Sequence, residues 1–262
     1  MSVETLLRLA LVPTAVWLAS LAARKWGHSV SGYLGGFPLI GGPITLYLAL
    51  DHGTEFAARS ATVTLAVIVA QGVYLIAFAR LAQRHRWPVA LVGGWACFAA
   101  AAVVVAFLPL SPPVALLLAV LGLATAWRAL PHPREDAPPP SVPPVELRLR
   151  LAAALALAIA ILWGSNVFGP VVSGVLLSVP VTGSIMPPFT LALYGADAVA
   201  RLTRGFVVGL SGFTAFFFAV SSGVVALGTG MGFLAAVVAA LATSTIASRV
   251  LKVAPIEEAG VD

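Results

Sequence analysis

The sequence predicts an all-α, polytopic membrane protein with nine transmembrane helices arranged as a 4+1+4 inverted-topology repeat. Three observations carry this prediction. Of the 262 residues, 60% are hydrophobic and only 10% are charged, the apolar runs are about one bilayer long, and the chain repeats itself at a fixed offset. An ordinary soluble domain carries about 25% charged residues. The composition therefore excludes a soluble enzyme, a disordered protein and a nucleic-acid binder, and it makes the lipid bilayer an expected partner.

Nine stretches are apolar enough to cross a bilayer, which takes roughly 20 residues. They are 5–23, 30–50, 60–79, 88–109, 113–130, 149–165, 169–194, 204–221 and 223–247. The first lacks the basic start and the cleavage pattern of a signal peptide, so we expect it to be retained. Ser111-Pro112-Pro113 divides a run of about two spans at a predicted tight turn. The alternative is that 113–130 does not cross, which leaves eight spans.

The chain matches itself without gaps when it is shifted by 142 residues. The matches include Glu, Arg, Pro and Gly, which chance pairing in a Leu- and Ala-rich sequence does not explain. Examples are Leu7-Arg8-Leu9-Ala10 with Leu149-Arg150-Leu151-Ala152, Pro38 with Pro180, and Gly53 with Gly195. We therefore divide the chain into a first membrane repeat (1–110), a connecting helix and proline-rich linker (111–144), a second repeat (145–248) and a cytoplasmic tail (249–262).

The Lys and Arg residues alternate between the loops. They occur in the loops that follow the first, third, fifth and seventh spans and in the tail, whereas the loops after the fourth, sixth and eighth have none. Since cytoplasmic loops are enriched in Lys and Arg, we expect the N-terminus outside and the C-terminus in the cytoplasm of a bacterial inner membrane. The two repeats then begin on opposite sides and are antiparallel, as in many secondary transporters. With eight spans they would be parallel.

The first repeat resembles the GlpM family of small bacterial integral membrane proteins between Ser31 and about Val105. The resemblance rests on Phe37-Pro38 and Gly42-Pro43, and on Arg86-Trp87-Pro88-Val89-Ala90-Leu91-Val92-Gly93 followed by Cys97. The second repeat departs from this pattern, because Ser221-Ser222-Gly223 stands where the Arg-x-Pro-x-Ala motif is expected. The resemblance implies a fused, diverged duplicate of a family whose members could pair, and it keeps a homodimer open as a partner. It implies little about activity.

Proline and glycine interrupt two matching helices near mid-span, where they should free backbone groups. Free backbone groups cannot face lipid, and paired interruptions in inverted halves are typical of a transporter binding site. The expected substrate-binding residues are Pro38, Gly41, Gly42, Pro43, Thr45, Pro180, Thr182, Gly183, Ser184, Pro187, Pro188 and Thr190, with Gln71 from the third span. The alternative is a pair of kinked helices whose glycines permit close packing. Gln71 either bonds a neighbouring helix or faces the cavity.

The function we expect is secondary transport of a small organic or anionic solute through a site between the two broken helices. No carboxylate falls at mid-membrane, which argues against a simple proton antiporter. The alternatives are a channel or a lipid scramblase, and then an intramembrane enzyme or an assembly protein. We expect no catalytic residues, metal or cofactor, because the sequence has no Ser-His-Asp set, no metal-ligand spacing and no phosphate loop. At the helix exits we expect solvated Asp51 and His52 and an Asp197–Arg201 pair.

Overall fold

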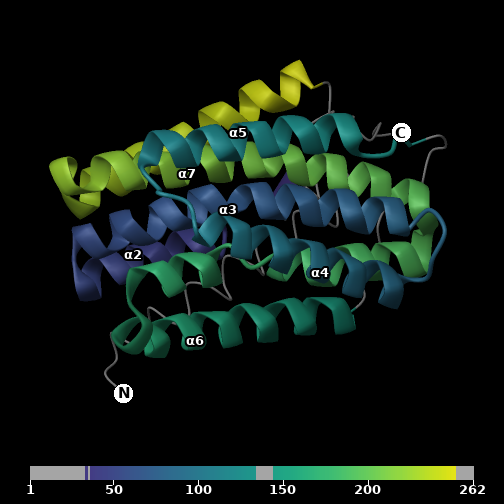
Figure 1. Ribbon diagram of the computed structural model, residues 1–262, viewed down its shortest axis with the longest axis horizontal. Helices are drawn as coiled ribbons and strands as arrows, with labels where there is room; N and C mark the ends of the chain where they lie inside the picture. The colour runs from purple at the N-terminus through teal and green to yellow at the C-terminus, as the bar shows by residue number, and fades with distance from the viewer. Residues whose placement is uncertain (1–32, 35, 134–143, 252–262) are drawn as a thin grey trace, which may run out of the picture.

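The computed structural model describes residues 33–34, 36–133 and 144–251 (Figure 1). This part of the chain is entirely helical. Its helices are α2 (Gly41–His52), α3 (Thr54–Leu81), α4 (Trp87–Ala106), α5 (Pro112–Ala129), α6 (Pro144–Leu177) and α7 (Val181–Val250). The predicted first span, most of the proline-rich linker and most of the tail lie outside the described residues.

Four described segments are long and apolar enough to cross a membrane. They are Thr54–Leu81, Trp87–Val105, Pro112–Ala129 and Gly169–Val250. The third coincides with the predicted fifth span, and it begins at Pro112 after an extended Ser111 (φ −120°, ψ 158°), where proline lacks only a hydrogen bond that the first turn does not make. The all-helical class and its compatibility with a membrane are therefore confirmed.

The two longest helices are interrupted by glycines at positive φ. Gly169 (φ 70°) interrupts α6, and Gly195 (φ 81°) and Gly228 (φ 76°) interrupt α7. Gly53 (φ 89°) separates α2 from α3 in the same way. Each has ψ within 20° of ±180°, a region almost restricted to glycine, so one residue reverses the chain without a longer loop.

Two of the predicted boundaries are wrong for this reason. The turn expected near Ser221-Ser222-Gly223 lies at Gly228, and the helix predicted from 204 already begins after Gly195. The hydroxyls of Ser221 and Ser222 donate to the Phe218 carbonyl (2.9 and 2.6 Å), which lets polar side chains remain inside a helix.

Alanine at Gly53 or at Gly195 is expected to lower the free energy of unfolding by about 1 kcal/mol, since no neighbour lies within 4 Å of the added Cβ and the cost is backbone strain alone. Gly230 is the control, because it also has open space around it but lies within helical α7. There alanine should be neutral or stabilising. Unfolding titrations in mixed detergent micelles measure all three, and equal effects at Gly195 and Gly230 would contradict the strain argument.

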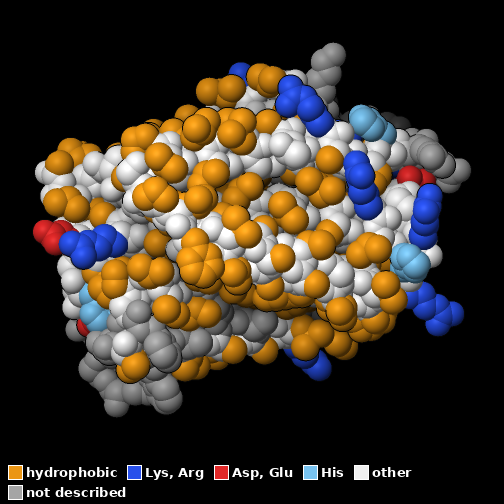
Figure 2. All heavy atoms as spheres, in the orientation of Figure 1, with side chains coloured by type: hydrophobic (Ala, Val, Ile, Leu, Met, Phe, Trp, Pro, Cys, Tyr) orange, Lys and Arg blue, Asp and Glu red, His pale blue; other side chains and the backbone are white. Residues whose placement is uncertain are grey.

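Helix α3 lies at the centre of the bundle. About 72% of its most apolar window is buried, against 28% in each of the other three candidate spans. It packs against every other described helix, and Figure 1 shows it between α5 and α4. Hydrophobic side chains cover the long flank of the molecule in Figure 2, with most basic side chains at one end. The outer helices therefore present apolar faces of the kind that lipid requires.

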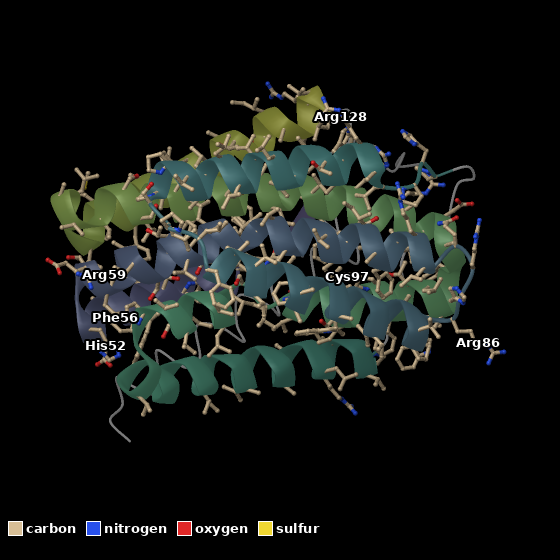
Figure 3. The ribbon with its side chains drawn as sticks, viewed as in Figure 1. His52, Phe56, Arg59, Arg86, Cys97 and Arg128 are labelled. Atoms are coloured by element: carbon tan, nitrogen blue, oxygen red, sulfur yellow. The ribbon has the colours of Figure 1, made fainter. Side chains whose placement is uncertain are left out.

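The two ends of the bundle differ in charge. Arg86 and Arg128 lie at the end where α3 and α5 finish, which we call the basic end (Figure 3). His52, Phe56 and Arg59 lie at the opposite end. α3 and α5 therefore run in the same direction, from the opposite end to the basic end.

Two arginines hold the C-terminus of α5 at the basic end. The last carbonyls of a helix lack intrahelical partners and carry its negative dipole end. Arg80 of α3 donates from Nε to the Ala129 carbonyl (3.2 Å). Arg204 of α7 donates from Nη2 to Leu130 and from Nε to Pro131, both at 3.1 Å. The Arg204 guanidinium also lies 4.6 Å from the centre of the Trp127 ring. The connecting helix is thus attached to both α3 and α7.

Candidate functional site

The helix in the second half breaks at Pro180, as the sequence predicts. α6 ends at Leu177, α7 begins at Val181, and Pro180 has a non-helical ψ of 63°. In the break, the Val181 amide donates to the Val179 carbonyl (2.8 Å) and the Ser184 amide donates to Pro180 (2.7 Å). The new helix thus begins with a tight turn.

The first half has a corresponding break around Pro38. Helical residues end at Gly36 and resume with α2 at Gly41. The Leu39 amide donates to the Phe37 carbonyl (2.7 Å), and the Gly42 amide donates to Pro38 (2.9 Å). Both predicted interruptions therefore exist as breaks between helices and not as smooth kinks.

Side chains of α3 donate to the carbonyls that the second break leaves free. Pro187 has no N–H, so the Gly183 carbonyl four residues earlier has no helical donor, and the Tyr74 hydroxyl donates to it (2.7 Å). Gln71 donates from Nε2 to the Ser178 carbonyl (2.7 Å). Of the two roles that the sequence left open for Gln71, the structure gives it the bond to a neighbouring helix.

Two further contacts extend this set of donors. Thr64 of α3 donates to the Gly174 carbonyl (3.0 Å). Trp95 of α4 donates from Nε1 to the Ser184 hydroxyl (3.0 Å), which itself donates to the Pro180 carbonyl (2.7 Å). The second break is consequently held in a polar cradle of four side chains from α3 and α4, formed by Thr64, Gln71, Tyr74 and Trp95.

The first break packs against aromatic side chains of α7 instead. A Cβ on Gly41 would lie 3.1 Å from the Phe217 ring, and one on Gly42 would lie 3.4 Å from the Phe216 ring. A Cβ on Gly36 would collide with the backbone carbonyl of Phe206. Glycine is needed here because two backbones and two rings approach closely. This close packing is what the alternative interpretation of these glycines expected.

The predicted binding residues lie on both sides of these breaks, and most are buried. Pro38, Gly41, Gly42, Thr45, Gln71, Pro180, Gly183, Pro187, Pro188 and Thr190 are buried, whereas Pro43, Thr182 and Ser184 are half-buried. Thr45 donates to the carbonyl of Gly41 in its own helix (2.7 Å), so its donor is already used. Thr182 and Ser184 are therefore the two half-buried hydroxyls of the set, and both lie just after the second break.

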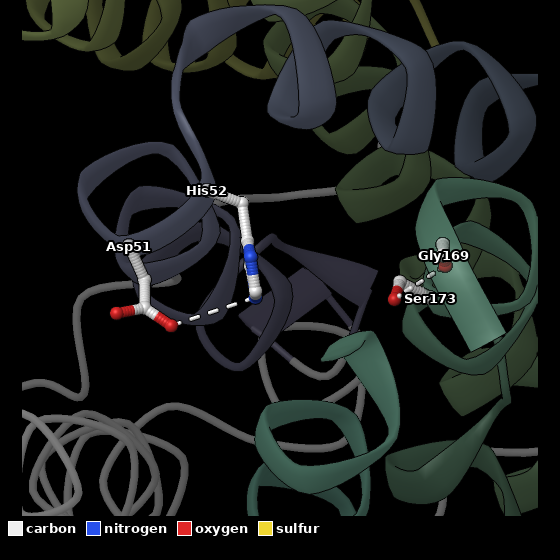
Figure 4. Close-up of polar contacts among 4 residues, drawn as sticks. All are labelled: Asp51, His52, Gly169 and Ser173. Atoms are coloured by element: carbon white, nitrogen blue, oxygen red, sulfur yellow. Dashed lines mark hydrogen bonds and ion pairs between the residues drawn. The ribbon is translucent and has the colours of Figure 1, made fainter. Parts of the chain in front are cut away.

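Polar residues at the opposite end are paired locally. His52 lies 3.5 Å from the Asp51 carboxylate and stacks on Phe56 with ring centres 4.6 Å apart. Ser173 donates to the carbonyl of Gly169 (3.0 Å), which closes the first turn after that glycine (Figure 4). The Asp197–Arg201 pair remains a prediction.

The polar cradle contains three residues that the sequence-based site left out, namely Thr64, Tyr74 and Trp95. A signal for two of them was present. Ser60, Thr64, Gln71 and Tyr74 recur every three, four or seven residues along α3, so they share one face of an otherwise apolar helix. A polar stripe on a membrane helix must face protein, because lipid offers it no partner.

Comparison of the chain with family models, with curated proteins and with solved structures gave no match. The GlpM-like resemblance of the first repeat therefore stays a prediction, and the functional argument rests on the geometry of the two breaks.

Proposed function

We propose that the protein is a secondary transporter that moves a small organic or anionic solute through a site between its two broken helices. In this proposal the chain has nine spans, and its halves form an inverted repeat. The observation that carries the proposal is the equality of the two breaks, whose backbones follow the same pattern 142 positions apart.

Three backbone hydrogen bonds recur at this offset with closely similar lengths. In the first half they join Phe37 to Leu34, Leu39 to Phe37 and Gly42 to Pro38; in the second they join Val179 to Leu176, Val181 to Val179 and Ser184 to Pro180. The glycine that ends each broken helix also matches, since Gly53 has φ 89° and ψ 166° and Gly195 has φ 81° and ψ −173°. Paired broken helices of this kind mark the substrate site in many transporters.

The direction of the equivalent helices supports inversion. Helix α3 reaches the α5 C-terminus through Arg80, close to its own last residue Leu81. The equivalent segment 196–227 reaches the same place through Arg204, close to its beginning. Because one helix ends where the other begins, the two run in opposite directions.

Each break packs on the long helix of the other half. Tyr74 of α3 contacts Gly183 beyond the second break, and Phe216, which is 142 residues after Tyr74, contacts Gly42 beyond the first. A rocking movement of one half against the other would therefore displace both breaks together. This reciprocity is what alternating access around a central site requires.

The type of solute follows from the groups at the breaks. α2 and the first segment of α7 both begin at a break, so each directs a helix N-terminus with its positive dipole end there. Helix N-termini favour anions, and the hydroxyls of Thr182 and Ser184 add neutral donors. We therefore favour a carboxylate or phosphate solute over a bare metal cation. The basic end would face the cytoplasm of a bacterial inner membrane.

Solute uptake into proteoliposomes tests the proposal. Radiolabelled phosphate, small mono- and dicarboxylates and amino acids would be screened against protein-free liposomes. For the solute that is taken up, Pro38→Ala and Pro180→Ala are each expected to lower the uptake rate at least about tenfold, because alanine allows the helix to close over the break. Pro88→Ala is the matched control, since Pro88 lies in the first turn of α4, where no helical bond is missing.

Two results would contradict the proposal. Equal uptake by the Pro38, Pro180 and Pro88 variants would remove the role of the breaks. Rapid loss of a fluorescent lipid's leaflet asymmetry in the same vesicles, without uptake of any solute, would favour the scramblase alternative.

A further inference from the structure

A cleft opens at the opposite end of the bundle, away from both breaks. It lies between the beginning of α3, the end of α4, the turn into α5 and the short helical segment after Gly169, and its volume is about 490 Å³. This volume lies within the range of small-ligand sites. Its walls include Arg59, Val63, Val67, Val105, Leu108 and Val171, and none of the predicted binding residues lines it.

The cleft changes from charged and exposed to apolar and buried along its length. Arg59, Leu108 and Val171 are exposed at its rim, whereas Val67 and Val105 at its floor are 1% and 4% exposed. Thr62 also lines it, but its hydroxyl proton is donated to the Ala58 carbonyl (2.9 Å). An occupant of the inner part therefore has to be a hydrocarbon.

The rim of the cleft lies at the depth of lipid headgroups. α3 has 28 residues and is about 42 Å long, which exceeds a hydrocarbon core of about 30 Å by roughly 6 Å at each end. Arg59 lies five residues into the helix, about 8 Å from its start, and therefore near the boundary between headgroups and hydrocarbon. Val67 is eight residues further along and about 12 Å deeper. The cleft thus extends from the headgroup level into the acyl region.

Arg59 supplies the charge at the mouth. The ion pair at this end joins His52 to Asp51 and does not include Arg59, whose side chain lies at the edge of the bundle in Figure 3. Leu108 and Val171 are exposed beside it, and so is Phe107, which is 84% exposed. A cation beside an apolar, lipid-facing rim is complementary to an amphiphile with an anionic head and a hydrocarbon tail.

We propose that this cleft binds one anionic phospholipid of the leaflet at the opposite end, with its phosphate on Arg59 and one acyl chain between α3, α4 and the segment after Gly169. The proposal requires only that the chain is embedded in a bilayer. It does not depend on transport, so it can hold whether or not the two breaks form a solute site.

Lipid binding to the purified full chain in detergent tests the proposal, with native mass spectrometry as the readout. The probes are dioleoyl phosphatidylglycerol, dioleoyl phosphatidylcholine with the same acyl chains, and glycerol phosphate without them. The wild type is expected to bind phosphatidylglycerol about tenfold more tightly than phosphatidylcholine, the value of one charge-assisted contact. Arg59→Gln should abolish that preference, whereas Glu55→Gln, one turn away on α3, should not reduce it.

A filled cleft should lose the lipid altogether. Leu108→Trp and Val171→Trp, on opposite walls, are each expected to lower phosphatidylglycerol binding about tenfold. Leu117→Trp, on the exposed face of α5, is the matched control and should bind as the wild type does. A retained preference in Arg59→Gln, equal binding by the Leu108→Trp and Leu117→Trp variants, or competition by glycerol phosphate at the lipid's own concentration would each overturn the proposal. Elution volume on size exclusion confirms that each variant is folded.

Discussion

Arg204→Met is expected to lower the free energy of unfolding by about 3 kcal/mol, because it removes a charged donor from two carbonyls and a cation from the face of an aromatic ring. Arg204 is only 9% exposed, so water replaces these contacts poorly. The Leu130 and Pro131 carbonyls, both 3.1 Å from the guanidinium, would be left without it. Arg204→Lys should lose roughly half as much, since an ammonium keeps the charge but cannot span both carbonyls with a planar fork.

The measurement is an unfolding titration with sodium dodecyl sulfate in mixed micelles, followed by far-ultraviolet circular dichroism. Arg128→Met is the control, because Arg128 lies at the same end of α5 but is exposed. It should change the free energy of unfolding by no more than about 0.5 kcal/mol. An equal loss in the two methionine variants would mean that net charge at the basic end, and not the bonds to the α5 C-terminus, stabilises the fold.

The sequence was sufficient for the features that single residues impose. Apolar runs predicted helices of membrane length, Ser111-Pro112-Pro113 predicted the start of α5, and Pro38 and Pro180 predicted the breaks. Each depends on local chemistry, such as a missing N–H or a fixed φ. Boundaries were harder, because a single glycine at positive φ reverses the chain where charged residues had suggested a longer loop. Gly195 and Gly228 are the cases in α7.

Contacts across the bundle could not be predicted in the same way. Arg204 reads as one more cytoplasmic charge, and its real partners are carbonyls more than 70 positions away. Trp95 likewise has no local feature that distinguishes it from an interface aromatic residue. Gln71 and Tyr74 could have been assigned by a combined argument, because a break needs donors and the polar stripe of α3 supplies them. Such pairing requires knowledge of which helices are neighbours, and periodicity alone does not contain it.

Tyr74→Phe is expected to lower the free energy of unfolding by about 2 kcal/mol, because the Gly183 carbonyl would lose its donor inside the bundle. Its ring remains in place, and Ser184 keeps Trp95 and Pro180 as partners. The decisive background is Pro187→Ala. Residue 187 would then have an N–H that can reach the Gly183 carbonyl through an ordinary helical bond. In that background Tyr74→Phe should cost no more than about 0.5 kcal/mol, so the cycle should give a coupling above about 1 kcal/mol.

Pro188→Ala provides the matched background, since it restores an N–H opposite the Ser184 carbonyl and leaves the Gly183 carbonyl as it is. There Tyr74→Phe should keep its full cost of about 2 kcal/mol. The same mixed-micelle titration measures all the variants of the two cycles. If Tyr74→Phe costs the same in both proline variants, Tyr74 stabilises the bundle by packing alone. If the cost falls only with Pro187→Ala, the proline at 187 and the tyrosine at 74 act as one unit, in which a hydroxyl from the first half replaces the hydrogen bond that the broken helix of the second half lacks.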